Sequence, residues 1–375
     1  MSLFDDAKDA VDKVVGVIPD VSDVNLPDLP DPSDLSDLRD LSDLPGFDDA
    51  LEQTDGEIVI RLVGDNDVTT GDDGDLIVTG SGNDTIDAGD GHNTIYADNI
   101  PSDSIGGDDE VTTGTGDDQI FTFGGDDLVT SGDGSDTIFT ADDDDLIDAG
   151  SGNDDVQSGR GQDTVLGGDG DDALRGGEDD DILDGGPGND RVIGGSDHDL
   201  VLGGPGDDLL EGRSGRDELI GGDGNDTALG GDGRDRLDGG PGADIIDAGA
   251  GIDLIFWDPE DAQVAGGRGN DTLQVSQGDL DLSALGGVIT GIEVVDMSRG
   301  EASTTVLTAS DVLDLSDTDD LTVLGDADDS LDAGAGWADG GTDAAGLQVF
   351  TQDVGGTVAT LLVQPDVQAN PDLVA

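Results

Sequence analysis

The sequence predicts an all-β fold, a right-handed parallel β-roll (a β-solenoid), with a short N-terminal helix and a linker before the roll and a β-rich cap after it. Three observations predict this fold. A nine-residue unit, Gly-Gly-x-Gly-x-Asp-x-U-x with U an aliphatic residue, recurs with hardly a break from about residue 61 to 274. Its last three positions suit a very short strand with one inward side chain. Its first six positions, rich in Gly and Asp, suit a turn.

The units keep one register over most of the chain. Four units occupy residues 61–96, a seven-residue insert follows at 97–103, and nineteen units run in phase over 104–274. Proline fixes φ and cannot lie inside a central strand, so its position tests the register. Three prolines fall at the third, turn-forming position of their units: Pro187, Pro205 and Pro241.

Two further positions keep their chemistry along these units. Position 8 is Val, Ile or Leu in every unit except at Ala228, and position 6 is Asp except at Asn66, Asn93 and Ala262. Two units make one coil of two turns and two strands. Coils stacked at roughly 4.8 Å form two parallel sheets that face each other across a thin layer of position-8 side chains, and about 11 coils give a rod of roughly 55 Å.

The strands alone cannot hold such a roll together. Three-residue strands with one apolar side chain per unit bury too little surface to offset the ordering entropy of so many glycines. The position-6 carboxylates and turn carbonyls of stacked turns would line a column of oxygen-only cages, and hard oxygen ligands in flexible loops suit Ca²⁺. The chain has no Cys and only two His, His92 and His198, which excludes a thiolate or multi-histidine site.

The candidate metal ligands are the position-6 aspartates, with the most regular run between Asp154 and Asp244. The alternative is that the aspartates only make an acidic solenoid soluble or adapt it to salt. A fixed position argues against that alternative, and so does the scarcity of Glu, which supplies nine of the 91 acidic residues. The full set is Asp75, Asp84, Asp118, Asp127, Asp136, Asp145, Asp154, Asp163, Asp172, Asp181, Asp190, Asp199, Asp208, Asp217, Asp226, Asp235, Asp244, Asp253 and Asp271.

This array resembles the RTX (repeats-in-toxin) family, whose glycine-aspartate nonapeptides form Ca²⁺-binding parallel β-rolls. The resemblance covers over half of the chain and implies roughly 15–20 bound Ca²⁺ ions. It also implies export by a type I secretion system and a place outside, or on the surface of, a Gram-negative bacterium. We expect the departures at Asn66, Asn93, Ala262 and the insert 97–103 to weaken or interrupt the ladder of ions.

The net charge of −78 on 375 residues makes a compact state repel itself unless counterions bind. We therefore expect a chain that is unfolded without Ca²⁺ and folded with it. Extracellular calcium modules bind at about 10⁻⁴ to 10⁻³ M, so the chain would stay unfolded in the cytosol and fold outside the cell. The acidity argues against nucleic acid and anionic membranes as partners. The sequence shows neither a transmembrane run nor an N-terminal signal peptide.

Two segments precede the roll, which is assigned to 57–274. Residues 1–20 are expected to form an amphipathic helix, because apolar residues recur at helical spacing over 4–18. This helix could cap the roll or bind a partner. Residues 21–56 form an acidic Leu/Pro/Asp linker, in which leucine recurs with a period of three over 26–44, a period that suits polyproline II. The linker is either disordered or presents a leucine edge that docks on the roll or on a neighbouring molecule.

Residues 275–375 keep strand character but lose the strict repeat. We expect a β-rich cap that shields the last open sheet edge and carries the type I secretion signal. Asp329 and Leu331 occupy the places of a decayed unit, and Trp337 and Phe350 supply bulk for a closing core. The segment resembles the C-terminal module of large RTX surface and adhesin proteins. Its candidate strands are 288–290, 292–295, 306–307, 321–324, 349–350 and 358–363.

No enzyme is predicted, because the chain has no His-Glu-x-x-His zinc motif, no Gly-x-Ser-x-Gly elbow and no P-loop. The sequence predicts a secreted calcium-binding structural or adhesive protein of the cell surface or extracellular matrix, which folds after export and assembles into a layer or filament. The alternative is a calcium-dependent polysaccharide- or surface-binding module. An enzyme accessory chain or a calcium buffer is a third reading. The expected partners are calcium ions, the secretion machinery, and either further copies of the chain or an extracellular polysaccharide.

Overall fold

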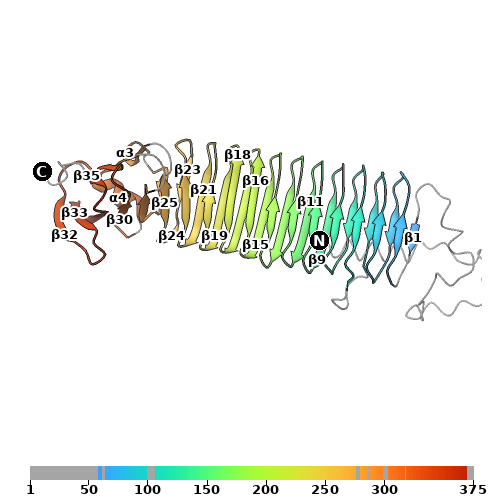
Figure 1. The fold of residues 1–375 in the computed structure, drawn as a ribbon. Helices are drawn as coiled ribbons and strands as arrows, with labels where there is room; N and C mark the ends of the chain where they lie inside the picture. The colour runs from blue at the N-terminus through green and yellow to red at the C-terminus, as the bar shows by residue number, and fades with distance from the viewer. Residues whose placement is uncertain are drawn as a thin grey trace, which may run out of the picture.

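A computed structural model describes residues 58–60, 64–98, 106–275, 279–285, 287–298, 303–316 and 318–369. The expected N-terminal helix 1–20 and linker 21–56 lie outside these residues. The described chain forms a straight rod of stacked coils, which ends in a smaller region of strands and short helices near the C-terminus (Figure 1). The rod is a parallel β-solenoid, as the nine-residue repeat predicts.

Alternate strands of the chain build the first sheet, because each coil contributes one strand to each side of the rod. All of its pairings are parallel, and β24 (Arg268–Gly269) pairs beside β21. Its other strands, in spatial order, are β1 (Ile58–Ile60), β3 (Leu76–Val78), β5 (Thr94–Tyr96), β7 (Gln119–Phe121), β9 (Thr137–Asp142), β11 (Asp155–Arg160), β13 (Ala173–Glu178), β15 (Arg191–Asp197), β17 (Leu209–Gly215), β19 (Thr227–Gly233), β21 (Ile245–Gly251), β23 (Gln263–Ala265) and β27 (Ile289–Thr290).

The second sheet holds the intervening strands. It is parallel as far as the pairing of β30 with β34, after which β34, β33 and β32 pair antiparallel. In spatial order its strands are β2 (Asp67–Thr69), β4 (Thr85–Asp87), β6 (Glu110–Thr112), β8 (Leu128–Thr130), β10 (Leu146–Asp148), β12 (Thr164–Leu166), β14 (Ile182–Asp184), β16 (Leu200–Pro205), β18 (Glu218–Asp223), β20 (Arg236–Asp238), β22 (Leu254–Trp257), β25 (Thr272–Val275), β28 (Val294–Asp296), β30 (Asp320–Leu324), β34 (Thr357–Val363), β33 (Gln348–Val354) and β32 (Ala338–Thr342).

The pairing register follows the repeat of two units per coil. Val156 pairs with Leu174, eighteen residues on. The register also passes the insert 97–103, where Ile86 pairs with Val111 across 25 residues. The strand ladder therefore continues from β4 to β6, on either side of the insert.

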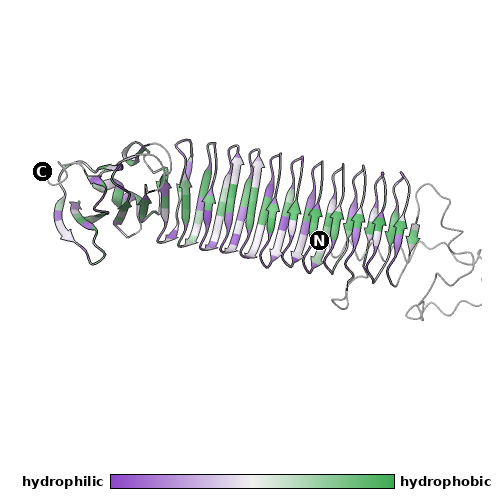
Figure 2. Cartoon of the chain, in the orientation of Figure 1, coloured by the Kyte–Doolittle hydropathy of each residue, from purple (hydrophilic) through white to green (hydrophobic). Residues whose placement is uncertain are grey.

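The core is a single layer of aliphatic side chains between the two sheets. The position-8 residues from Ile77 to Leu273, including Ala228, are at most 1% exposed. Figure 2 shows this layer as apolar residues at the centres of successive strands. Buried and more exposed residues alternate along these strands, which is the period of two that a strand with one buried face requires.

The C-terminal region closes the roll with an antiparallel hairpin and a small third sheet. The six predicted stretches each overlap a strand, and Trp337 and Phe350 are buried as expected. The third sheet has the strands β26 (Leu280–Asp281), β29 (Thr304–Val306), β31 (Ser330–Asp332) and β35 (Gln368–Ala369).

Two helices in this region were not predicted, α3 (Leu282–Leu285) and α4 (Ala309–Leu315). The sequence did carry a signal for α4, because Thr308 and Asp311 form a reciprocal capping box at its start. The helix buries Val312 and Leu315 against the end of the roll.

The core layer predicts a difference between two neighbours in β21. Ile246 is fully buried, whereas Ile245 is 42% exposed on the outer face. Ile246→Ala should lower the free energy of unfolding of the calcium-loaded chain by about 2–5 kcal/mol, because it leaves a cavity in the layer. The matched variant Ile245→Ala should change it by no more than about 0.5 kcal/mol. Urea unfolding at fixed Ca²⁺ measures both, and equal effects would contradict a single central core layer.

Candidate calcium sites

The residue at position 6 of each unit lies directly before a strand, so alternate units place these residues in two rows along the rod. The first aspartate row precedes the strands of the first sheet, and the second aspartate row precedes those of the second sheet. All of the predicted ligands are buried in one of these rows. The first row contains Asp75, Asn93, Asp118, Asp136, Asp154, Asp172, Asp190, Asp208, Asp226 and Asp244. The second contains Asn66, Asp84, Asp109, Asp127, Asp145, Asp163, Asp181, Asp199, Asp217, Asp235, Asp253 and Asp271.

One carboxylate oxygen of each residue ties neighbouring coils together. The backbone N–H of Asp190 donates to Oδ1 of Asp208 at 2.8 Å, and that of Asp208 donates to Oδ1 of Asp226 at 2.8 Å. The other oxygen is different. From Asp172 to Asp244, Oδ2 of every position-6 aspartate is buried and has no hydrogen-bond partner among the described residues. A buried, ionised oxygen without a donor is strongly unfavourable unless a cation compensates it.

Backbone carbonyl oxygens approach the same turns from the preceding coil. A Cβ at Gly206, where φ is +153°, would lie 1.4 Å from the carbonyl oxygen of Gly188, and one at Gly204 would lie 2.3 Å from that of Gly186. At these two positions glycine avoids the collision that a side chain would make with the carbonyl. The turns therefore bring carboxylate and carbonyl oxygens close together.

The residue type at position 1 of the unit differs between the N-terminal and the C-terminal part of the roll. In the N-terminal part it is often Ser or Thr, whose hydroxyl donates to a carbonyl one coil on, as Thr79 does to Ala97 and Ser131 to Ala149, both at 2.7 Å. From 167 to 239 it is Gly. A Cβ at Gly203 would lie 2.4 Å from Oδ2 of Asp208. In the C-terminal part of the roll, glycine at position 1 thus lets the carboxylate lie where a side chain would otherwise collide with it.

Burial without a counterion raises the pKa of these carboxyl groups. Desolvation raises the pKa of Asp109 to about 9 and that of Asp145 and Asp181 to about 8, with a further contribution from neighbouring aspartates. Backbone hydrogen bonds to the carboxylates act in the opposite direction but are outweighed. At neutral pH these three carboxyl groups would therefore hold a proton or pair with a cation.

The residues fit Ca²⁺ in particular. The position-6 carboxylates together with the position-2 and position-4 carbonyls would hold it, an all-oxygen set in flexible loops. Within the described ranges no three acidic or histidine side chains converge on one point. Each ion would therefore depend on backbone oxygens as well as on carboxylates. Bound Ca²⁺ would neutralise the buried carboxylates and crosslink neighbouring turns.

Two departures from the repeat, Asn93 and the insert 97–103, leave the row of hydrogen bonds between coils intact, although Asn93 removes a carboxylate charge. Oδ1 of Asn93 accepts the N–H of Asp75 at 2.9 Å, so an uncharged residue keeps the row. The row also passes the insert 97–103, where the N–H of Asp84 donates to Oδ1 of Asp109 at 2.8 Å. At Ala262 the first row ends, and the Ala262 N–H bonds the carbonyl of Asp244 instead. The expected interruption at the insert is thus absent from the hydrogen-bonded row.

Sequence reasoning missed two members of the second row. Asp109 was not among the predicted ligands, although the register of unit 104–112 places it at position 6. Glu293 extends the row beyond the repeat, since its Oε2 accepts the N–H of Asp271 at 3.0 Å. The spacing of 22 residues is outside the period, so no repeat signal could have indicated Glu293.

This fold and these two rows define a calcium-binding parallel β-roll. The sequence model of the RTX calcium-binding nonapeptide repeat matches more than half of the chain, and the chain belongs to this family. The matched residues are 64–99, 104–138, 130–165, 166–201, 193–228, 202–237, 220–255 and 261–279.

A search of curated protein sequences finds no match. One similar solved structure is the X-ray structure of a hyperactive, Ca²⁺-dependent, β-helical antifreeze protein from an Antarctic bacterium. It is 20% identical, with a TM-score of 0.30 over 66% of this chain and 85% of that one. No helix in the described part of the chain is long and apolar enough to cross a membrane.

The rows predict different effects for two adjacent aspartates. Asp208→Asn should keep the hydrogen bond that Oδ1 accepts from the Asp190 N–H, as Oδ1 of Asn93 does for Asp75, but remove one buried charge. We expect fewer bound Ca²⁺ ions and a calcium midpoint for folding raised about 2- to 10-fold, because the site loses a charged ligand. Asp207→Asn, at an exposed position, should leave both unchanged. Equilibrium dialysis and circular dichroism measure the two quantities, and equal behaviour of the variants would contradict the assignment.

The raised pKa values predict an unusual pH dependence without calcium. Because burial raises the pKa of Asp109, Asp145 and Asp181 from 3.8 to about 8 or 9, the cation-free roll binds more protons than the unfolded chain between these limits. The free energy of unfolding of the cation-free roll is therefore highest below about pH 4, and it falls as the pH rises through 8 to 9. In a chelator, the β signal in circular dichroism should therefore be larger at pH 4 than at pH 8. A signal that does not change with pH would refute this.

Proposed function

We propose that this RTX-family chain is a secreted structural protein that folds into a rod when it meets extracellular calcium. The observation that carries the proposal is the run of buried, unpartnered Oδ2 atoms from Asp172 to Asp244. Such a run cannot stay ionised in a low-calcium compartment without a large desolvation cost. Calcium binding then supplies the folding free energy, so that folding follows export.

The surface charge supports a role outside the cell. A chain of net charge −78 repels itself when it lacks bound cations, which favours the extended form that an export channel needs. Type I secretion of a Gram-negative bacterium is the route that the RTX family suggests. The rod would then act at the cell surface or in the extracellular matrix, as a structural or adhesive element rather than as a catalyst.

Export and folding can be tested in one host. The full chain is produced in a Gram-negative strain with and without a type I exporter, and the medium contains either about 1 mM free Ca²⁺ or a chelator. We expect the chain in the medium only when the exporter is present, and protease-resistant only when Ca²⁺ is present. A chain that is folded and protease-resistant inside the cytoplasm would overturn the proposal.

A further inference from the structure

A buried carboxylate that does not occupy position 6 lies at Asp98, inside the insert 97–103. The side chain of Thr79 donates to the carbonyl of Ala97 at 2.7 Å, eighteen residues on, so the start of the insert keeps the register of the preceding coil. Asp98 therefore lies where that coil has Gly80, at position 2, which is glycine in most units. A carboxylate with only 3% of its surface exposed thus enters the roll at a place where the repeat provides no side chain.

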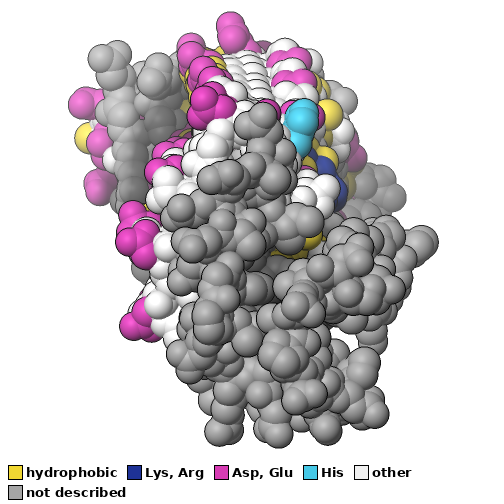
Figure 3. Space-filling view, turned by 90° about the vertical axis from the view of Figure 1, so that its right-hand side faces the viewer, with side chains coloured by type: hydrophobic (Ala, Val, Ile, Leu, Met, Phe, Trp, Pro, Cys, Tyr) yellow, Lys and Arg dark blue, Asp and Glu magenta, His cyan; other side chains and the backbone are white. Residues whose placement is uncertain are grey.

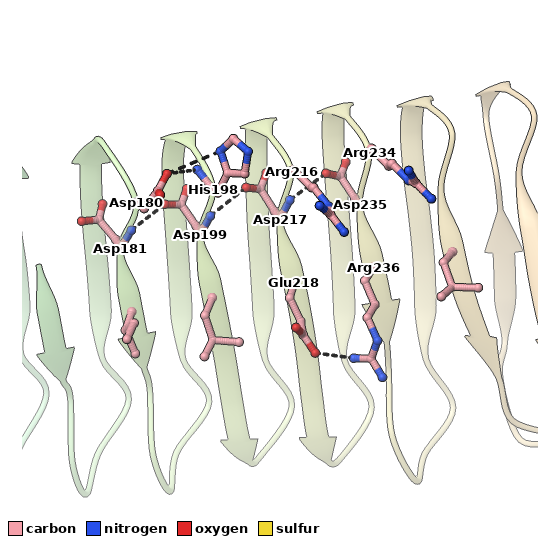
Figure 4. Close-up of a pocket in the computed structure, with 13 residues that line it drawn as sticks. Asp180, Asp181, His198, Asp199, Arg216, Asp217, Glu218, Arg234, Asp235 and Arg236 are labelled. Atoms are coloured by element: carbon pink, nitrogen blue, oxygen red, sulfur yellow. Dashed lines mark hydrogen bonds and ion pairs between the residues drawn. The ribbon is translucent and has the colours of Figure 1, made fainter. Parts of the chain in front are cut away.

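The regular part of the second aspartate row has one buried carboxylate in each turn. Figure 4 shows this part, where Asp181, Asp199, Asp217 and Asp235 follow each other on successive turns, each N–H donating to the next carboxylate. Other acidic side chains are solvated, and Figure 3 shows many of them on the surface of the rod, seen from its N-terminal end. Asp98 belongs to neither group, because it is buried and lies outside the position-6 pattern.

The hydrogen bonds of Asp98 leave one of its oxygens unexplained. Oδ2 accepts the N–H of Gly107 at 3.2 Å, in the turn that leads to Asp109. Oδ1 is buried and has no hydrogen-bond partner among the described residues, and the same is true of Oδ2 of Asp109. An asparagine would accept the bond from Gly107 equally well, so this bond does not account for a buried charge. This turn therefore has two buried, unpartnered carboxylate oxygens where a regular turn has one.

A backbone carbonyl oxygen lies beside the Asp98 carboxylate. A Cβ at Gly106 would lie 1.3 Å from the carbonyl oxygen of Gly124 and 2.2 Å from Oδ2 of Asp98, so these two oxygens are no more than 3.5 Å apart. Both are acceptors, and an ionised carboxylate has no hydrogen to donate to a carbonyl. Two acceptor oxygens at this separation suit a shared cation, and Ca²⁺ takes oxygen ligands at about 2.3–2.6 Å from the ion.

The charged neighbours of Asp98 are other aspartates. Burial raises the pKa of Asp98 to about 7, and the charges of Asp127 and Asp84 add to the rise. Burial also raises the pKa of Asp109 to about 9, and among the neighbouring charges Asp98 contributes most. No lysine or arginine of the described chain precedes Arg160, and none of its salt bridges involves these four aspartates. No basic side chain of the described residues therefore compensates the cluster.

We propose that Asp98 and Asp109 together bind one Ca²⁺, in a site that the insert creates and the repeat does not provide. The two carboxylates would supply the charge, and the carbonyl of Gly124 would supply a neutral oxygen. Calcium affinity rises with the charge of the ligands, so the site binds calcium more tightly than the same turn would with Asp109 alone. The insert thus strengthens the second aspartate row at the point where the repeat is broken.

This proposal rests on the proposed calcium-driven folding and adds one site to it. Asp98→Asn keeps the acceptor for the Gly107 N–H but removes the charge. In about 10 mM Ca²⁺ at pH 7.5, its urea midpoint, followed by circular dichroism, should fall by about 0.5 M, as expected when one bound ion is weakened about tenfold. If Asp98 bound no ion, the substitution would relieve a buried charge. An unchanged or higher midpoint would therefore overturn the proposal.

Two controls separate calcium binding from packing. Asp126→Asn removes the charge of an exposed aspartate in the adjacent coil and should leave the urea midpoint unchanged. In a chelator at pH 4 Asp98 is protonated, because burial raises its pKa to about 7, so Asp98→Asn should then have the same midpoint as the unaltered chain. A loss of the same size in acid would show that Asp98 acts through packing alone, and would overturn the proposal.

A double variant tests whether the two carboxylates share one ion. Asp109→Asn should lower the midpoint in Ca²⁺, and Asp98→Asn with Asp109→Asn should lower it by less than the sum of the two single changes. A fully additive loss would overturn the shared site.

The response of the unaltered chain separates this site from the proposed function. Calcium-induced β structure together with an Asp98→Asn midpoint that does not fall would overturn the site alone. A chain with no calcium response would overturn the proposed function as well.

Discussion

The structure depends on the burial of one carboxylate in every turn. Each position-6 aspartate uses Oδ1 to hold the N–H of the coil before it, as Asp226 does for Asp208, and so fixes the stacking distance. Its second oxygen then lies in a space that proteins rarely leave without a partner. The roll is therefore stable only when something positive occupies that space. In acid, protons would neutralise these carboxylates, and at neutral pH bound Ca²⁺ would do so.

Other features of the chain follow from this requirement. Glycine at most of the positions 2 and 4 lets carbonyl oxygens enter the same turns, and a Cβ at Gly206 would lie 1.4 Å from the carbonyl oxygen of Gly188. Short strands would suffice because ions, and not a thick core, would hold the turns.

The sequence predicted those parts of the molecule that repeat. A period of nine identified the strands, the core layer at position 8 and the two rows of carboxylates, because each depends on neighbours at a fixed spacing. It did not predict Glu293 or the helix α4, whose partners are set by tertiary contacts outside the period. The insert 97–103 was expected to weaken or interrupt the ladder of ions, and the structure shows that the strand pairing itself continues past it, from Ile86 to Val111. The split between Ser/Thr and Gly at position 1 was visible in the sequence, yet its meaning required the position of Oδ2 of residues such as Asp208.

The most direct test counts calcium while the fold is monitored. Far-UV circular dichroism is recorded at pH 7.5 as free Ca²⁺ rises from a chelator-buffered level to about 10 mM, and bound calcium is measured in the same samples. The account predicts little β signal in the chelator and a cooperative rise as roughly 15–20 ions bind per chain. A full β signal in the chelator, with no calcium bound, would contradict it.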